Sequence, residues 1–192
     1  AGRRDLFEPA LARFREKWAA MGSPRIIAAC STCFRTFRDH LPDLPVVSLW
    51  QVMADADLPG GLDPSRKMPA DPVAVLDPCT TRHEPGIREA VRQVMARLGV
   101  GVEELRLSGD TTECCGFGGL MQNANPDLAR EVVRRRAEQS DRDYLAYCAM
   151  CRDNLAAAGK RTLHLLDLVF PDPETPNPAA RQIGRASCRE RV

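Results

Sequence analysis

The sequence predicts an α/β protein made of two tandem, related units. Each unit is expected to hold a small, mainly parallel sheet flanked by helices, and the first unit is expected to be truncated. Two observations predict this fold class. Short apolar runs, typical of buried parallel strands, alternate with longer helical stretches along the 192 residues. A segment near the start also recurs 118 residues later, which indicates an internal repeat.

The repeat is clearest around two C-x-x-C motifs. Cys30-Ser-Thr-Cys33 aligns with Cys148-Ala-Met-Cys151, and a short apolar run precedes the first cysteine in both copies. The helical stretches upstream align without a gap, residues 8–22 on residues 126–140. The chain is therefore expected to hold the C-terminal part of one unit and the whole of a second, with the rest of the first unit upstream.

The first unit, residues 1–57, begins with a helix on which Leu11, Phe14 and Trp18 share one face. Glycine and proline at 22–24 end this helix, and the apolar run that follows predicts a buried strand. The expected elements are a helix at 6–21, a strand at 25–29, a helix from the first C-x-x-C motif to about 40, a strand at 46–48 and a helix at 49–56.

Residues 58–71 are rich in proline and glycine and predict a linker between the units. A long surface loop inside one domain would have the same composition and stays open as an alternative. A disordered tail is expected at 172–192. Its last ten residues, 183–192, resemble a translated sequencing adapter, although a natural tail is the alternative, and Cys188 is excluded as a ligand either way.

The second unit, residues 72–171, repeats the alternation of strands and helices. Asn125 is a favourable N-cap with Pro126 at the first helical position, and glycines at 99 and 159 end two helices. The expected elements are strands at 72–77, 105–108, 144–147 and 162–164, helices at 85–98, 126–139, 153–158 and 166–170, and loops around residues 114–116 and 148–151.

Five cysteines of the second unit follow its strands with the spacing C-x34-C-C-G-x31-C-x2-C. Open α/β sheets bind ligands at the carboxyl ends of their strands. Adjacent cysteines and a C-x-x-C turn direct thiolates at one metal centre, and five thiolates are more than one tetrahedral zinc ion takes. The pattern predicts a polynuclear thiophilic centre held by Cys79, Cys114, Cys115, Cys148 and Cys151.

Simpler interpretations stay open beside this one. Cys114 and Cys115 could be a buried pair of small apolar side chains before a turn. A zinc ion would make the unit a structural or interaction module without redox activity. Cys148 and Cys151 could form a thiol–disulfide pair. Cys30 and Cys33 are candidates for a second, incomplete site, and are otherwise unliganded thiols.

The five cysteines resemble those of the cysteine-rich CCG domain of heterodisulfide reductase subunits. Iron–sulfur subunits of glycolate, lactate and glycerol-3-phosphate oxidising systems have similar domains. The resemblance covers about residues 72–170, and each of the five falls on a family cysteine. It implies tandem CCG-type units and a 4Fe-4S cluster, cubane or noncubane, bound by these five thiolates.

The same resemblance implies an oxidoreductase component that works with redox partner subunits or domains of the flavin or ferredoxin type. Electrons would pass through the cluster to a disulfide, a quinone or another carrier. No flavin or nicotinamide fingerprint is present in the sequence, so catalysis is expected to need those partners, and no catalytic residue is assigned.

Composition narrows the setting further. A net charge of +1 without a basic stripe does not favour nucleic acid as a partner, and no apolar run predicts a membrane span. The cysteine spacings favour reduced thiols, and we expect a cytoplasmic location, with membrane association only through a partner.

The remaining polar residues carry weaker expectations. His40, His83 and His164 are expected to be surface or core side chains rather than ligands. Asp77 is expected to serve the turn before Pro78, or to form a hydrogen bond near the cluster. The three arginines at 134–136 are expected on a solvated helix face, with a docking patch for an acidic partner as the alternative.

Overall fold

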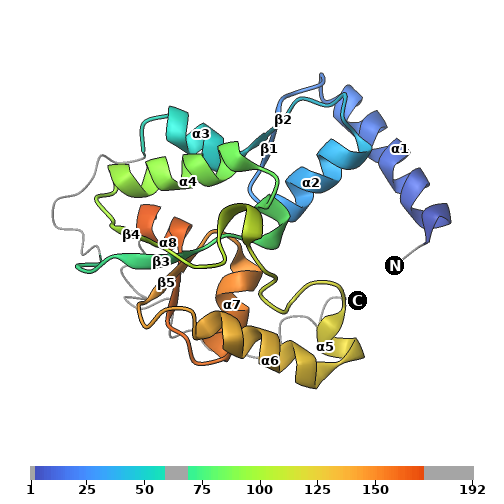
Figure 1. Ribbon diagram of the computed structural model, residues 1–192. Coiled ribbons are helices and arrows are strands. Elements are labelled where there is room, and N and C mark those ends of the chain that lie inside the picture. The colour runs from blue at the N-terminus through green and yellow to red at the C-terminus, as the bar shows by residue number, and fades with distance from the viewer. Residues whose placement is uncertain (1–2, 59–68, 171–192) are drawn as a thin grey trace.

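A computed structural model describes residues 3–58 and 69–170 of the chain. Strands and helices alternate through these residues, and every strand pairing between them is parallel (Figure 1). The predicted α/β class with small parallel sheets flanked by helices is confirmed. Most of the predicted linker and the whole tail beyond residue 171 lie outside the described residues.

Residues 3–58 form a two-stranded sheet and three helices. The long first helix extends away from the sheets (Figure 1) and has no fully buried side chain. Its contact with the second helix includes the rings of Phe14 and Phe37, whose centroids are 5.0 Å apart. The elements are α1 (Arg4–Ala20), β1 (Ile26–Ala28), α2 (Ser31–His40), β2 (Val46–Ser48) and α3 (Leu49–Asp55).

Residues 69–170 form a four-stranded parallel sheet with the order β4-β3-β5-β6. All four residues of the central strand β3 are buried, as its continuous apolar sequence predicted. The elements are β3 (Val73–Leu76), η1 (Cys79–Thr81), α4 (Pro85–Arg97), β4 (Val102–Glu104), η2 (Gly109–Thr111), α5 (Met121–Ala124), α6 (Pro126–Ala137), β5 (Tyr144–Ala146), α7 (Ala149–Ala157), β6 (Thr162–His164) and α8 (Leu165–Val169).

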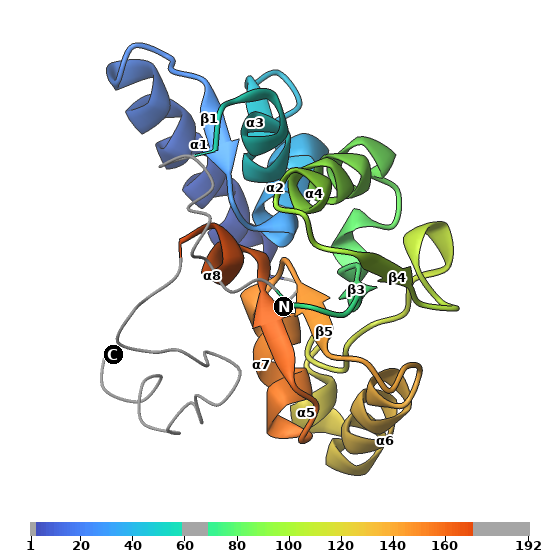
Figure 2. The ribbon, with the colours of Figure 1, turned by 90° about the vertical axis from the view of Figure 1, so that its left-hand side faces the viewer.

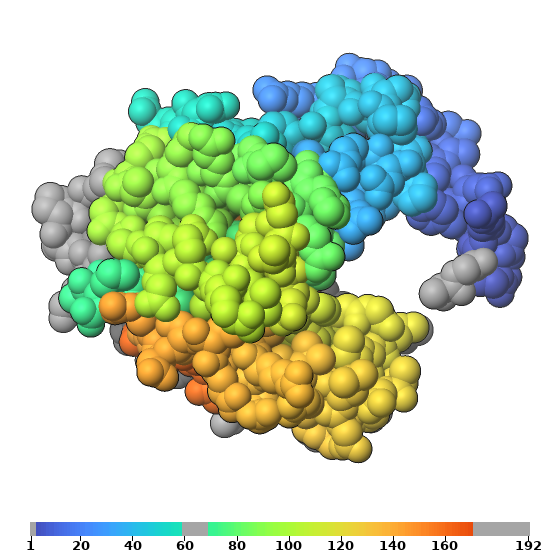
Figure 3. Space-filling view, in the orientation of Figure 1, coloured from blue at the N-terminus to red at the C-terminus, as the bar shows by residue number. Residues whose placement is uncertain are grey.

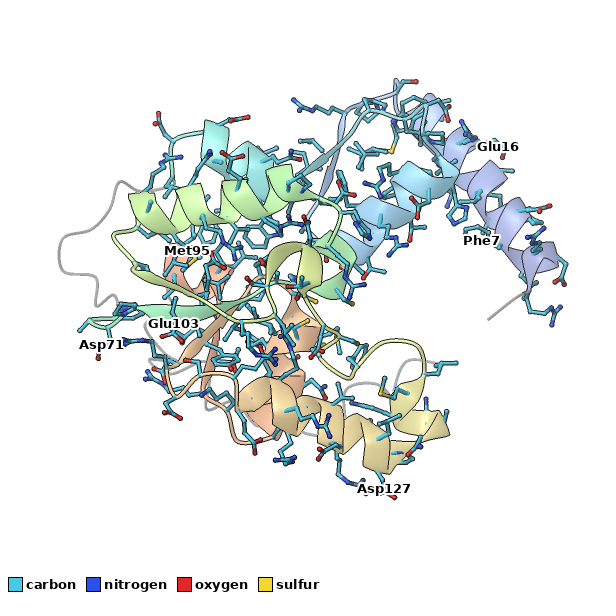
Figure 4. The ribbon with its side chains drawn as sticks, in the orientation of Figure 1. Phe7, Glu16, Asp71, Met95, Glu103 and Asp127 are labelled. Atoms are coloured by element: carbon cyan, nitrogen blue, oxygen red, sulfur yellow. The ribbon has the colours of Figure 1, made fainter. Side chains whose placement is uncertain are left out.

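Alternate residues of the strands enter two separate cores. Val73 and Val75 face α3, α4 and α8, whereas Ala74 and Leu76 face α7 and the cysteine loops. Figure 2 shows α3 and α4 beside each other, and α6 and α7 on the other side of the sheet. Met95 points from α4 into the first of these cores and is fully buried (Figure 4).

The first core joins the two parts of the chain. Trp50 and Met53 of α3 pack with the buried residues of α4, and the rings of Trp50 and Tyr147 meet edge to face at 5.8 Å. The guanidinium of Arg97 on α4 donates hydrogen bonds to the carbonyls of Met53 and Ala54. Helix α3 is thus held to the second part of the chain by apolar and polar contacts, and the division into two units stays a prediction.

Two element predictions were wrong. The strand expected at 105–108 lies three residues earlier, as β4, at the edge of the sheet. Glu103 and Glu104 are tolerated in this strand because they form ion pairs with Arg142 and Arg92. The helix expected at 153–158 begins at Ala149, so the second C-x-x-C motif is the first turn of a helix and not a loop.

The expectation for the arginines at 134–136 was wrong for the third one. Arg134 and Arg135 face solvent and pair with Glu131. Arg136 is fully buried, because it lies on the same face of α6 as the buried residue Val133, three positions earlier.

Asp77 does more than serve the turn before Pro78. It is 1% exposed, and its carboxylate pairs with Arg92, at 2.5 Å from Nη1 and 3.0 Å from Nη2. The Tyr147 hydroxyl and the Gly109 N–H also donate to it, at 2.7 and 3.0 Å. Four hydrogen bonds therefore compensate the burial of this charge at the carboxyl end of β3.

No helix in the described ranges combines the length and the apolar character that a membrane crossing would require.

Replacing Arg92 with methionine would leave Asp77 buried without its cation. We expect Arg92→Met to lower the free energy of unfolding by about 3 kcal/mol, measured by urea denaturation. The matched control is Arg142→Met, which removes the more exposed ion pair with Glu103 of β4 and should cost at most about 1 kcal/mol. Equal losses in the two variants would contradict this account of the Asp77 network.

Candidate metal centre

The five cysteines predicted as ligands meet at the carboxyl edge of the four-stranded sheet. Cys79 lies in η1, directly after β3, and Cys148 is the N-cap of α7, directly after β5. Cys151 lies in the first turn of α7, and Cys114 and Cys115 lie in the loop between η2 and α5. This arrangement follows from the parallel topology, which places the carboxyl ends of neighbouring strands side by side.

Each of the five thiols shifts the pKa of a neighbouring thiol, in the order Cys79, Cys114, Cys115, Cys151, Cys148, which indicates that they lie close together. The Sγ atoms of Cys115 and Cys151 are 3.2 Å apart. None of the cysteines in the described part of the chain forms a disulfide. The structure thus brings the five side chains together, and their role as ligands stays a prediction.

Interactions among these thiols lower the pKa values of some and raise those of others. Hydrogen bonds from Cys115 and Cys79 lower the pKa of Cys114. The bond between Cys79 and Cys114 raises the pKa of Cys79, and the bond between Cys114 and Cys115 raises the pKa of Cys115 to about 11. The bond to Cys115 raises the pKa of Cys151 well above its usual value, whereas the Cys151 thiol lowers the pKa of Cys148 to about 6. Without a metal, the negative charge therefore rests on Cys114 and Cys148.

The turn after the paired cysteines requires glycine. Gly116 has φ +86°, and its N–H donates to the Cys114 sulfur at 3.3 Å. A Cβ atom at this position would lie 2.8 Å from Cγ2 of Val133 and 3.1 Å from the carbonyl oxygen of Ala129, both on α6. The main chain can therefore pack against α6 only because residue 116 has no side chain.

Polar side chains that the sequence did not single out hold the cysteine loops in place. The amide of Asn154 on α7 donates to the Cys115 carbonyl at 2.5 Å. The hydroxyl of buried Thr112 donates to the Asp77 carbonyl at 2.8 Å, and Arg82 donates to the Thr112 carbonyl. Arg136 also belongs to this group, because it donates to the Thr112 hydroxyl. Of these residues, only Arg136 could have been predicted as buried from the sequence, because it follows the apolar residue Val133 by three positions in a helix.

The donor set fits a group with several metal atoms. In the described ranges, no three or more His, Cys, Asp or Glu side chains are arranged to hold one metal ion. An iron–sulfur cluster distributes its thiolate ligands over several iron atoms, and five adjacent, reduced thiols suit that mode of binding.

The two cysteines of the first C-x-x-C motif are exposed and border this site. They begin α2 as Cys148 and Cys151 begin α7, and the Cys30 sulfur accepts a hydrogen bond from the Cys33 N–H at 3.4 Å. Ser31, between them, shares a 2.6 Å hydrogen bond with Thr80, the residue after Cys79. The surface is hollowed between α1 and α2 on one side and α5 on the other (Figure 3).

The three histidines lie in different environments. Nδ1 of His164 accepts a hydrogen bond from the Leu166 N–H and caps α8. The His40 ring packs edge to face on Phe7 of α1, and His83 is exposed.

Comparisons with known proteins agree with the cysteine pattern. Residues 73–165 match the model of the cysteine-rich domain family, CCG. A subunit of the dihydromethanophenazine:CoB–CoM heterodisulfide reductase of Methanosarcina barkeri is 29% identical over 70% of this chain and 36% of its own length. A subunit of the fumarate reductase (CoM/CoB) of Methanothermobacter marburgensis is 25% identical over 89% of this chain and 37% of its own.

The glycolate oxidase iron-sulfur subunit of Escherichia coli is 30% identical over 48% of this chain and 23% of its own length. The chain therefore spans less than two fifths of the length of these relatives. The resemblance inferred from the cysteine spacing is confirmed.

Replacing Gly116 with alanine should distort the turn that carries the paired cysteines. Positive φ and the contact with Val133 act together, and we expect Gly116→Ala to lower the free energy of unfolding by about 2 kcal/mol. Gly118→Ala is the control, because a Cβ there meets no atom within 4 Å. Urea denaturation measures both, and a Gly116 variant as stable as the Gly118 variant would refute the packing argument.

Proposed function

We propose that this chain, whose residues 73–165 belong to the cysteine-rich domain family, is part of an iron–sulfur subunit of a reductase complex. The observation that carries the proposal is that five reduced thiols gather at one edge of a parallel sheet, with the sulfurs of Cys115 and Cys151 at 3.2 Å. The names of the relatives, two reductase subunits and an iron–sulfur subunit, support the same reaction class.

Cys79, Cys114, Cys115, Cys148 and Cys151 would hold a 4Fe-4S cluster, cubane or noncubane. Such a cluster supplies one-electron transfer, which no side chain provides. Cys115 and Cys151 are buried and keep water from one side of the site. Cys79, Cys114 and Cys148 are partly exposed, and this side is where electrons would enter or leave. Asn154 and the N–H of Gly116 orient the paired cysteines.

The residues before the linker would be the remainder of a first unit of the same kind. In the second unit, β5 pairs with strands on both sides, whereas its counterpart β1 pairs only with β2 among the described residues. Ile27 of β1 is 53% exposed, which is unusual for an apolar strand residue. An upstream strand would pair with this edge, a helix packed on the sheet would cover Ile27, as helices cover its counterpart Leu145, and upstream cysteines would complete the site begun by Cys30 and Cys33.

The partners follow from the proposed chemistry. A flavin or ferredoxin-type subunit or domain would supply electrons, and a disulfide, a quinone or another carrier would accept them. The proposed location is the cytoplasm, with membrane association through a partner subunit.

A second candidate function is thiol–disulfide exchange at Cys148 and Cys151. A partly exposed cysteine with a pKa of about 6, beside a buried one with a raised pKa, is the arrangement that favours such exchange.

Metal analysis of the chain after anaerobic purification tests the main proposal. We expect about four irons and four sulfides per chain and a brown colour with broad visible absorption. One zinc ion per chain without sulfide would contradict the electron-transfer proposal and would indicate a structural zinc module.

Replacing Cys148 with serine separates the cluster from the thiol–disulfide candidate. A ligand role predicts that Cys148→Ser loses most of the iron together with thermal stability, whereas an exchange role predicts lost exchange activity with an unchanged fold. Cys33→Ser is the control, because it alters the equivalent motif outside the five-thiol site, and it should keep the iron content of the natural sequence.

A further inference from the structure

Arg136 is a buried guanidinium whose hydrogen-bonding capacity is only partly used. Nη1 donates to the carbonyl of Leu107 at 2.9 Å and to the side-chain oxygen of Gln139 at 3.0 Å. Nη2 reaches the hydroxyl of Thr112 at 3.4 Å. The third nitrogen, Nε, is buried and has no hydrogen-bond partner among the described residues.

All three partners of Arg136 are neutral. Within residues 3–58 and 69–170, no carboxylate forms an ion pair with it, and the attracting carboxylate of Glu113 belongs to an exposed residue. Arg92 shows the contrast, since its guanidinium pairs with both Asp77 and Glu104. Burying a cation is unfavourable unless an anion compensates its charge, so an anion near Arg136 would stabilise it.

The cysteine site lies next to this guanidinium. Burial lowers the pKa of Arg136, while Glu113, Tyr144 and the thiols of Cys151 and Cys115 act to raise it. Helix α6, which carries Arg136, packs against α7, which carries Cys151 (Figure 1). Thr112, the partner of Nη2, is separated from Cys114 by one residue.

We propose that Arg136 is the buried counter-charge of the cluster that these cysteines would hold, and that it raises the reduction potential of that cluster. The inference rests on the proposed function. Reduction adds one electron, and therefore one negative charge, to the cluster. A fixed cation in a poorly solvated environment stabilises the reduced form more than the oxidised form. Arg136 acts on the cluster through this field and is a positioning residue, not a ligand.

The test is a redox titration of the cluster-loaded chain with optical detection, without oxygen. Arg136→Met replaces the apolar stem of the side chain with an unbranched apolar side chain and removes the charge. We expect it to shift the one-electron equilibrium about tenfold toward the oxidised form, which is a potential 59 mV lower. Arg136→Lys keeps the charge and should keep most of the potential.

Arg135→Met is the matched control. It makes the same change of net charge one residue away, but the Arg135 side chain is 72% exposed and pairs with Glu131, so solvent screens it. Its potential should equal that of the natural sequence.

The outcomes separate the inference from the proposed function. A natural chain without iron and sulfide would contradict the proposed function, and the inference would fall with it. A loaded Arg136→Met variant with an unchanged potential would overturn the inference alone.

Neutral variants that fold but take up no iron are also informative. Arg136→Gln is the second neutral variant, because its amide can keep the bond to Leu107. If both neutral variants stay empty while Arg136→Lys takes up the full amount, the charge is needed for assembly, which supports Arg136 as the counter-charge of the cluster. If Arg136→Lys stays empty as well, the role is structural and the inference is wrong.

Discussion

The close packing of five thiols at one edge of a sheet is the constraint on which the rest of this structure depends. Neighbouring thiols do not all ionise readily, and here the pKa values of Cys114 and Cys148 are lowered while those of Cys79, Cys115 and Cys151 are raised. Each loop that contributes a thiol is held by a separate contact. Asp77 anchors the end of β3, Asn154 binds the carbonyl of Cys115, and Gly116 lets the turn lie against α6.

The two cores of the molecule support this edge from opposite faces of the sheet. Cys115 and Cys151 are themselves part of the core beneath α7, so the site continues the packed interior and is not an addition to its surface. Tyr147 connects the other core to the polar network, because its ring packs on Trp50 while its hydroxyl donates to Asp77. Through its Trp50, helix α3 thus contacts Tyr147, the residue directly before Cys148.

The sequence predicted most of what local patterns determine. Continuous apolar runs located the strands, although β1, predicted to be buried, exposes Ile27 by 53%. The cysteine spacing identified five side chains that the fold brings together. Two of the failures concern charged residues whose burial or pairing depends on tertiary contacts. The charged residues Glu103 and Glu104 do not resemble an apolar strand, and their arginine partners, which are distant in sequence, could not be recognised from the local pattern. Arg136 was assigned to the surface because the two arginines before it belong there, although its helical register placed it inside.

The hydrogen bond between Ser31 and Thr80 has a mechanical consequence. Ser31 lies between the two cysteines of the first motif, and Thr80 directly follows Cys79. Pulling the two loops apart would leave two shielded hydroxyl groups without partners, at a cost of about 1 kcal/mol. This hydrogen bond therefore links the start of α2 to η1, so that Cys30, Cys33 and Cys79 are held near one another although 49 positions in the sequence separate Ser31 from Thr80.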